Sequence, residues 1–416
     1  MEVLYVVGSC LTKNTSANMS HNSFIKGLLD NGCNVDIIMA NDSWGEEDNA
    51  LPIWDECKYY TFNSISKREK FRRFVHEKFL DKKNNNVISN EIVNTSDKIE
   101  ENKELNNRPN GLREKLKKVF YLIFPTDPVY PLHSDWLKNA KKFNSEKQYD
   151  LVLSNSSPAA SHRLVYELKK GKKIKYDRWI QVWEDPWYYD LYGGKSDSIK
   201  EEEHFLLQQA SEIFYVSPLT LEYQKDFFPD CKEKMDWVPL PFFEFEKKEK
   251  NKKVDTLSFG YFGDYYSHTR NLVPFYNVLN KLNYKGYIFG DSDLNFIPNK
   301  NMIISGRVTL DKLEEIQDNT GVLVHLCNLK GGQIPGKIYH YSATDKPVLF
   351  ILDGTTEEKE IIYNYFKKFD RYYFCDNEED SIEKVINKIS CDFGIKSFHK
   401  IEEFNPKNVV SKLLTR

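Results

Sequence analysis

The sequence predicts an α/β protein of two domains, each built on a parallel sheet. Short apolar segments of strand length alternate with helical segments in two successive series. The first series begins at the N-terminus and the second begins near residue 257. The chain has 416 residues, which is too many for one compact domain and about right for two.

The first series opens with a strand at 2–7, a helix near Ser20–Asp30 and a strand at 35–39. Phe24 and Leu28 share one face of that helix, and a glycine after Asp30 ends it. This strand–helix–strand order favours a parallel sheet. Further strands of the first domain are expected at 58–62, 150–154, 178–183, 213–216 and 236–238.

The second series follows a charge-rich linker at 245–253. We therefore expect a first domain over residues 1–245, a second over 254–394 and a C-terminal helical segment over 395–416 that crosses back to the first. The expected strands of the second domain are 257–262, 286–289, 302–305, 321–326, 347–352 and 372–374, with helices at 271–282, 311–318 and 357–369.

The first domain contains a polar insertion at 84–110 that is rich in Asn, Glu, Lys and Ser, and we expect it to be disordered. The segment Leu112–Phe124 after it places Leu116 and Phe120 on one stripe with lysines beside it. This pattern fits a helix lying on an anionic membrane surface, and it also fits an amphipathic helix packed on its own domain.

Composition and charge exclude several classes of protein. The net charge of -3 argues against a nucleic-acid partner. The seven cysteines are scattered without a Cys-x-x-Cys pair, so we expect reduced thiols and no zinc site. The N-terminus lacks a signal sequence, and no segment approaches the roughly 18 apolar residues of a membrane span. These features predict a cytoplasmic protein.

The segment 332–341, Gly-Gln-Ile-Pro-Gly-Lys-Ile-Tyr-His-Tyr, predicts a loop that enters a helix and precedes a buried strand. Pro335 fits the first turn of a helix, where free N–H groups attract an anion. Lys337 adds a positive charge, so a phosphate or pyrophosphate would suit this position. The alternative is a helix start that only links two strands.

Two expected strands of the first domain end in polar or aromatic loops. The strand at 150–154 leads into Asn-Ser-Ser-Pro, and the strand at 178–183 leads into Glu-Asp-Pro-Trp. Ligands of open α/β sheets bind beyond the carboxyl ends of the strands, so both loops are candidate binding loops.

Together, the Ser-Ser-Pro loop, the Asp-Pro-Trp loop and the Pro-Gly-Lys-Ile-Tyr segment resemble GT-B-fold glycosyltransferases of the bacterial cell-surface polysaccharide type (family 4-like, group 1). The resemblance covers nearly the whole chain. It implies two Rossmann-like domains that face each other across a cleft, with the acceptor on the first and a nucleotide sugar on the second. It further implies retaining transfer of a sugar to a glycan or lipid-linked glycan, without a metal or other cofactor.

On the donor side, the resemblance implies that Arg270 meets the pyrophosphate, and a surface position is the alternative. Arg307 is a weaker candidate, for the edge of the base. The retaining members of the family carry a Glu-x7-Glu pattern, but this chain has Gly332 and His340 at the corresponding places. His340 could bind a ribose instead. The expected donor-binding residues are Gly263, Arg270, Arg307, Gln333, Pro335, Gly336, Lys337 and His340.

On the acceptor side, Asp185 is the strongest catalytic candidate, because a carboxylate between two tryptophans suits a sugar. The alternative is a helix cap, and Glu184 competes for the same role. His21, in the first helix, is a second catalytic candidate as a general base. The expected acceptor or sugar contacts are Gly8, Asn155, Ser156, Ser157, Trp183 and Trp187.

The Asp291-Ser292-Asp293 segment matches the Asp-x-Asp motif of metal-dependent glycosyltransferases. It follows a strand exit where Asp and Ser are common turn formers, so we expect no metal site there. The chain has no P-loop and no Gly-x-Gly-x-x-Gly after the first strand, which excludes the usual kinases, ATPases and dinucleotide dehydrogenases.

Three hypotheses follow. The first is a glycosyltransferase. The second is a sugar-nucleotide epimerase or hydrolase on the same fold. The third is a non-catalytic glycan- or nucleotide-binding partner, which the missing glutamates at 332 and 340 keep open.

Overall fold

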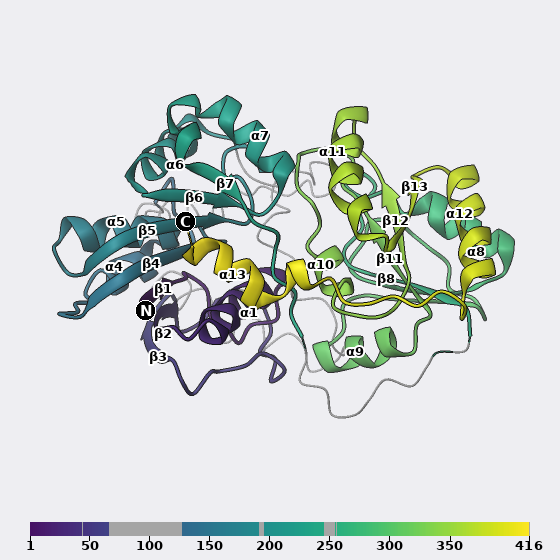
Figure 1. The fold of residues 1–416 in the computed structure, drawn as a ribbon, viewed down its shortest axis with the longest axis horizontal. Coiled ribbons are helices and arrows are strands. Elements are labelled where there is room, and N and C mark those ends of the chain that lie inside the picture. Colours follow the sequence, from purple (N-terminus) through teal and green to yellow (C-terminus); the bar gives the residue numbers. More distant parts are fainter. Residues whose placement is uncertain (44, 66–126, 191–194, 245–253, 255, 416) are drawn as a thin grey trace, which may run out of the picture.

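The computed structural model describes residues 1–43, 45–65, 127–190, 195–244, 254 and 256–415. Two α/β halves lie side by side, one for each series of strands (Figure 1). The expected insertion at 84–110, the segment Leu112–Phe124 and the linker 245–253 lie outside the described residues.

The N-terminal half is a seven-stranded sheet with the order β3-β2-β1-β4-β5-β6-β7, and all its neighbouring strands run parallel. The strands are β1 (Glu2–Val6), β2 (Asn34–Ala40), β3 (Lys58–Phe62), β4 (Gln148–Ser156), β5 (Lys175–Trp183), β6 (Glu212–Tyr215) and β7 (Met235–Trp237). The helices are α1 (Ser16–Asp30), α4 (Ser134–Ala140), α5 (Ala160–Lys170), α6 (Asp197–Gln209), α7 (Pro218–Phe227) and the 3-10 helix η1 (Pro229–Lys234).

The C-terminal half is a six-stranded parallel sheet with the order β10-β9-β8-β11-β12-β13. The strands are β8 (Ser258–Phe262), β9 (Lys285–Phe289), β10 (Met302–Ser305), β11 (Val322–Leu326), β12 (Val348–Leu352) and β13 (Tyr372–Asp376). The helices are α8 (Val273–Leu282), α9 (Leu310–Asp318), α10 (Lys337–Tyr341), α11 (Thr356–Phe366), η2 (Lys367–Phe369) and α12 (Glu379–Asp392).

The central strands are buried on both faces. Every residue of β8, β11 and β12 is buried, as parallel sheets covered by helices on both faces require. The two-domain α/β architecture predicted from the strand pattern is therefore confirmed.

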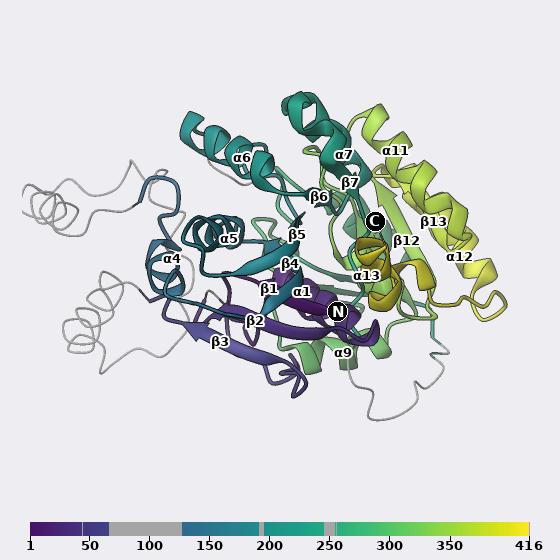
Figure 2. The ribbon, with the colours of Figure 1, turned by 60° about the vertical axis from the view of Figure 1, so that its left-hand side comes forward.

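The C-terminal segment returns to the N-terminal half. After α12, the chain passes through η3 (Glu402–Phe404) and ends in α13 (Pro406–Leu414), which packs against α1 (Figures 1 and 2). The contact is close, because a Cβ placed on Gly27 would lie 2.4 Å from the carbonyl oxygen of Pro406. The last segment of the chain is thus part of the core of the first half.

Local capping explains where the elements differ from the sequence prediction. Helix α1 begins at Ser16 rather than near Ser20, because the Thr15 side chain accepts a hydrogen bond from the backbone N–H of Asn18. The expected long helix at 357–369 becomes α11 and the 3-10 turn η2. None of the described helices is both long and apolar enough to cross a bilayer.

Candidate functional site

The two halves meet through the loop between β11 and α10. The backbone oxygen of Gly332 accepts hydrogen bonds from Ser217 Oγ at 3.3 Å and Thr220 Oγ1 at 3.0 Å, both at the start of α7. Gln333 Nε2 donates to Asp185 Oδ1 and, at 3.1 Å, to Asp190 Oδ1. The carboxyl ends of the two sheets therefore face each other, and this loop joins them.

Three cationic side chains gather around the Gly263-Asp264 turn at the end of β8. Arg307 forms ion pairs with Asp264 and, at 3.1 Å, with Asp291. A Cβ on Gly263 would lie 3.8 Å from Arg270 Nη1, which places the Arg270 guanidinium beside this turn. The negative charge of Asp264 raises the pKa of Lys337, and the positive charge of Arg307 lowers it. The expected donor residues of the second domain thus lie together.

Lys337 is the first residue of α10, and it makes no hydrogen bond or ion pair with the residues that the structure describes. Burial lowers the pKa of its ammonium group to about 8. Helix α10 has only five residues, with Gly336 at its N-cap and the Pro335 oxygen accepting from the N–H of Ile338. The expected anion site therefore depends on the Lys337 side chain rather than on a long helix dipole.

His340 has a different environment from the one that the sequence suggested. Its Nδ1 accepts a hydrogen bond from the backbone N–H of Phe243 at 2.9 Å. Burial, and then the positive charge of Lys337, lower its pKa to about 3, so the ring is neutral. Because Nδ1 already accepts the hydrogen bond from Phe243, only Nε2 is left for the predicted ribose contact.

Asp185 follows β5 and contacts Gln333 of the C-terminal half. Its side chain is exposed, Gln333 holds Oδ1, and Oδ2 makes no hydrogen bond to a residue in the described part of the chain. The enclosing protein, and then the charge of Asp190, raise the pKa of Asp185 to about 6, while Gln333 and Arg270 act in the opposite direction. The positive charge of Arg270 thus acts on this carboxylate from the other half.

His21 belongs to a closed buried network. Its Nδ1 lies 3.1 Å from Tyr5 Oη, and its Nε2 lies 3.1 Å from the Ser157 carbonyl oxygen, to which it must donate. Asn155 Nδ2 donates to the same Tyr5 hydroxyl at 3.0 Å. The ring is completely buried, and burial lowers its pKa to about 4. In this arrangement His21 cannot reach an acceptor, and it supports the loop after β4 instead.

Glu184 lies beneath Asp185, with its Oε1 buried and 3.7 Å from His21 Nδ1. Burial, and then the charge of Asp185, raise its pKa well above the usual range. The sequence left Asp185 and Glu184 as alternatives for the same catalytic role, and Asp185 is the one that is exposed to solvent.

The other first-domain candidates divide between core and surface. Trp183 is fully buried, donates to Gln181 Oε1 and packs on the ring of His162, so it offers no face to a sugar. Trp187 is half-buried against Tyr130. Asn155 and Ser156 are buried and Ser157 is exposed.

Gly8 also serves packing. A Cβ there would lie 2.7 Å from Pro158 Cγ and 3.1 Å from the Trp136 ring, and the Gly8 N–H donates to Ser161 Oγ. The absent side chain therefore allows β1 to pack against the loop after β4.

The sequence did not single out Asp190 or Glu203. Buried Glu203 on α6 accepts hydrogen bonds from the backbone N–H groups of Trp187 and Tyr188, at 3.2 and 2.7 Å, and so fixes the loop after Asp185. Burial raises its pKa to about 7. A glutamate on a helix of mixed charge carries no local signal of such a role, and only the tertiary structure reveals it.

The Asp-x-Asp motif is engaged by protein groups. Asp291 pairs with Arg307, and Asp293 accepts hydrogen bonds from the backbone N–H and the hydroxyl of Ser267, at 2.8 and 2.6 Å. Both carboxylates thus have partners in neighbouring loops.

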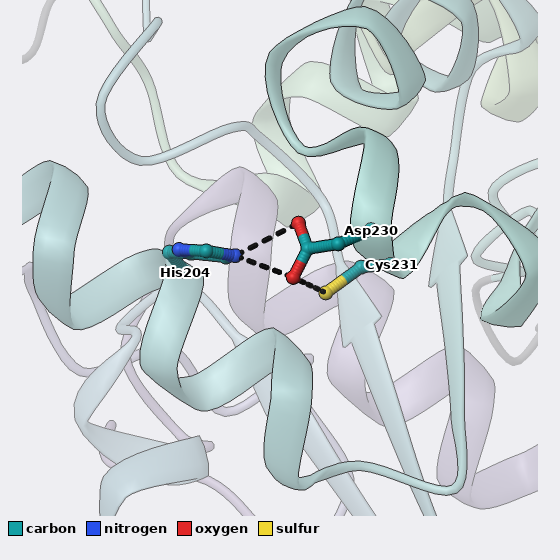
Figure 3. A group of neighbouring side chains, drawn as sticks. All are labelled: His204, Asp230 and Cys231. Carbon is teal, nitrogen blue, oxygen red and sulfur yellow. Dashed lines mark hydrogen bonds and ion pairs between the residues drawn. The ribbon is translucent and has the colours of Figure 1, made fainter.

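A second group of chemically active side chains lies away from these loops, where α6 meets η1 (Figure 3). His204 Nε2 lies 2.9 Å from both oxygens of Asp230, and Gln208 Nε2 donates to the same carboxylate at 3.0 Å. The Cys231 sulfur lies 3.9 Å from Asp230 Oδ2, and burial raises the pKa of this thiol to about 11. The pairing fastens α6 to η1.

Comparison with known proteins supports the fold. No family model matches the chain, and no curated protein matches its sequence. A glycosyltransferase from Rickettsia africae has a similar structure, with 12% identity, a TM-score of 0.50 and coverage of 99% of this chain and 91% of that chain. Arabidopsis thaliana UGT89C1 complexed with quercetin has 11% identity and a TM-score of 0.49, with coverage of 99% of this chain and 94% of that chain. The apo form of the lipopolysaccharide outer core galactosyltransferase WaaB has 12% identity and a TM-score of 0.44, with coverage of 100% of both chains.

The likeness to the Rickettsia protein, together with the two parallel sheets, establishes that this chain has the GT-B fold.

Proposed function

We propose that this protein is a glycosyltransferase that moves a sugar from a nucleotide-sugar donor to a hydroxyl group of a glycan or lipid-linked glycan. The observation that carries the proposal is that Arg270, which lies with Lys337 around the Gly263-Asp264 turn of one half, acts by its charge on the exposed carboxylate of Asp185 in the other half. A cationic wall suits a leaving nucleotide diphosphate, and a free carboxylate oxygen suits an attacking hydroxyl.

In the reaction, the acceptor oxygen forms a bond to the anomeric carbon of the donor sugar. The bond from that carbon to the phosphate oxygen breaks, and its electron pair stays on the nucleotide diphosphate. The hydroxyl proton passes to Asp185, whose Oδ2 is open to it. Charge develops on the leaving phosphate, so Lys337 and Arg270 stabilise the transition state more than the ground state.

The stereochemistry depends on which face of the donor sugar is turned toward Asp185. The family resemblance favours retention of configuration. The anomeric proton coupling of the product, measured by NMR, distinguishes retention from inversion.

Metal independence is part of the proposal, because Asp291 and Asp293 already have partners in neighbouring loops. We expect the initial rate to be the same within about twofold with and without EDTA, since cationic side chains perform the task of a metal ion. Loss of activity in EDTA and recovery with Mn²⁺ would contradict this.

The proposed biological setting is assembly of cell-surface polysaccharide on the inner face of the membrane. A lipid-linked acceptor and a peripheral location follow from the resemblance and from the basic, amphipathic segment Leu112–Phe124.

The decisive experiment screens sugar nucleotides for thermal stabilisation and then measures transfer with the best donor. We expect Asp185→Asn to keep the stabilisation and lose about 10²-fold in turnover. Stabilisation without transfer by the wild type would favour the non-catalytic partner, and epimerised or hydrolysed donor would favour the second enzyme class. No stabilisation by any sugar nucleotide would overturn the proposal.

A further inference from the structure

Gln333 connects the two halves by its side chain. Its Nε2 donates to Asp185 Oδ1 and to Asp190 Oδ1, so the two N–H bonds of one amide group serve two carboxylates. The preceding residue is fixed as well, because the Gly332 oxygen accepts hydrogen bonds from Ser217 and Thr220. The amide therefore belongs to a loop anchored at several points on the opposite half.

The same loop carries the donor cation. Lys337 follows Gln333 by one short turn of chain, and it begins α10. Movement of this loop away from the first half would therefore remove Lys337 and release Asp185 in the same motion. Gln333 and Lys337 therefore lie on a single segment.

The bridge matters because Asp185 lies in an acidic environment. Asp190 follows on the same loop, Glu184 lies beneath, and Glu203 supports the loop from α6. The positive charge of Arg270 acts on Asp185 from the other half and lowers its pKa. The amide supplies hydrogen bonds to two carboxylates that would otherwise repel each other, and it occupies Oδ1 while leaving Oδ2 open.

We propose that Gln333 is the positioning residue of the reaction: its amide bridges Asp185 and Asp190, so that the catalytic carboxylate is held in position when the donor-binding loop is docked on the first half. The expected effect on turnover rests on the proposed function. The expected effect on the titration of the Asp185 carboxylate does not depend on it.

The kinetic experiment compares Gln333→Ala and the near-isosteric Gln333→Met with the wild type between pH 5 and pH 9. Loss of a hydrogen bond to an ionised carboxylate raises its pKa. We therefore expect the acid limb of kcat, near pH 6 in the wild type, to move up by about one pH unit. Turnover then falls about fivefold at pH 6 and recovers by pH 8, with the donor KM changed by less than about twofold.

Gln208→Ala is the matched control. This glutamine also donates to an aspartate, Asp230, but it lies where α6 meets η1, away from the docked loop. We expect its pH profile to match the wild type. A uniform loss of activity at every pH in the Gln333 variants, without a shift of the acid limb, would show a merely structural role and overturn the inference.

A second measurement is independent of turnover. In protein labelled with ¹³C at the aspartate carboxyl carbons, the Asp185 signal is assigned as the one missing from Asp185→Asn. Titration should give a higher midpoint in Gln333→Met than in the wild type and in Gln208→Ala. An unchanged midpoint overturns the inference whether or not transfer is found. A raised midpoint in a protein without transfer activity supports the bridge and overturns the proposed function alone.

Discussion

The two halves share one architecture but differ in the charged side chains that are candidates for chemistry at the loops where they meet. The N-terminal half presents carboxylates, with Asp185 exposed, Glu184 partly buried and Glu203 fully buried behind it. The C-terminal half presents Arg270, Arg307 and Lys337. A parallel sheet determines that ligands bind at the carboxyl ends of its strands, but not which ligands bind. The loop residues therefore determine which chemical groups each half contributes.

The halves also differ in how they satisfy their polar groups. In the N-terminal half, His21 has a partner at each ring nitrogen, and together with Tyr5 and Asn155 it forms a closed internal network. In the C-terminal half, Lys337 is buried enough to have a lowered pKa and has no hydrogen-bonding partner among the described residues. A desolvated cation without a partner is costly in the free protein, and an anionic ligand offsets that cost.

The largest effect should come from removing the charge of the C-terminal half. We expect Lys337→Ala and Arg270→Ala each to lower kcat by about 10²–10³-fold, comparable to the loss of one oxyanion donor, with little change in unfolding temperature. Lys330→Ala is the control, because this exposed lysine lies in the same loop. Near-normal turnover in both variants would place the pyrophosphate elsewhere.

A smaller effect should appear in the dependence of the donor KM on pH. The pKa of Lys337 is lowered to about 8 in the free protein, so the group is almost fully charged at pH 7 and half charged near pH 8, and it loses its charge as the pH rises further. A bound diphosphate keeps the group protonated, and donor affinity therefore falls with rising pH. We expect the donor KM to increase about fivefold from pH 8 to pH 9.

Lys337→Arg should abolish this dependence, because a guanidinium stays charged throughout the range. Lys330→Arg should retain it. A wild-type KM that is flat up to pH 10 would mean that Lys337 does not contact the donor.

The sequence predicted the fold well because strands and helices in an alternating α/β chain have local signals. Apolar segments such as Val348–Leu352, bounded by turns, mark buried strands directly. The candidate site was less accessible to sequence reasoning. The position of Asp185 at a strand end could be read from its motif, but its contact with Gln333 joins residues 148 positions apart in the chain.

The tryptophans show the same limit. Trp183 and Trp187 look alike in the sequence, both beside an acidic loop, yet one is in the core and the other is half-buried. Which face of a final strand residue turns inward depends on the helices packed above it, and Trp183 meets His162 of α5. No local pattern carries that information.

The smallest expected effect concerns the boundary between the halves. Helix α13 follows the second half in the chain but packs on α1 of the first, with Gly27 at the closest approach. A Cβ at Gly27 would lie 2.4 Å from the Pro406 oxygen and 2.5 Å from Val410 Cγ2, so Gly27→Ala should lower the free energy of unfolding by about 1–3 kcal/mol.

The control is Gly171→Ala at the end of α5, where the nearest atom would be 3.2 Å away, and the expected change is within about 0.5 kcal/mol. Both are measured by urea unfolding followed by tryptophan fluorescence, which reports on the first half through buried Trp136, Trp179 and Trp183. If α13 is an integral part of the first half, Gly27→Ala lowers the midpoint of that transition although α13 is encoded after the second half. An unchanged midpoint would show that the first half folds without the returning helix, and would assign α13 to the C-terminal half alone.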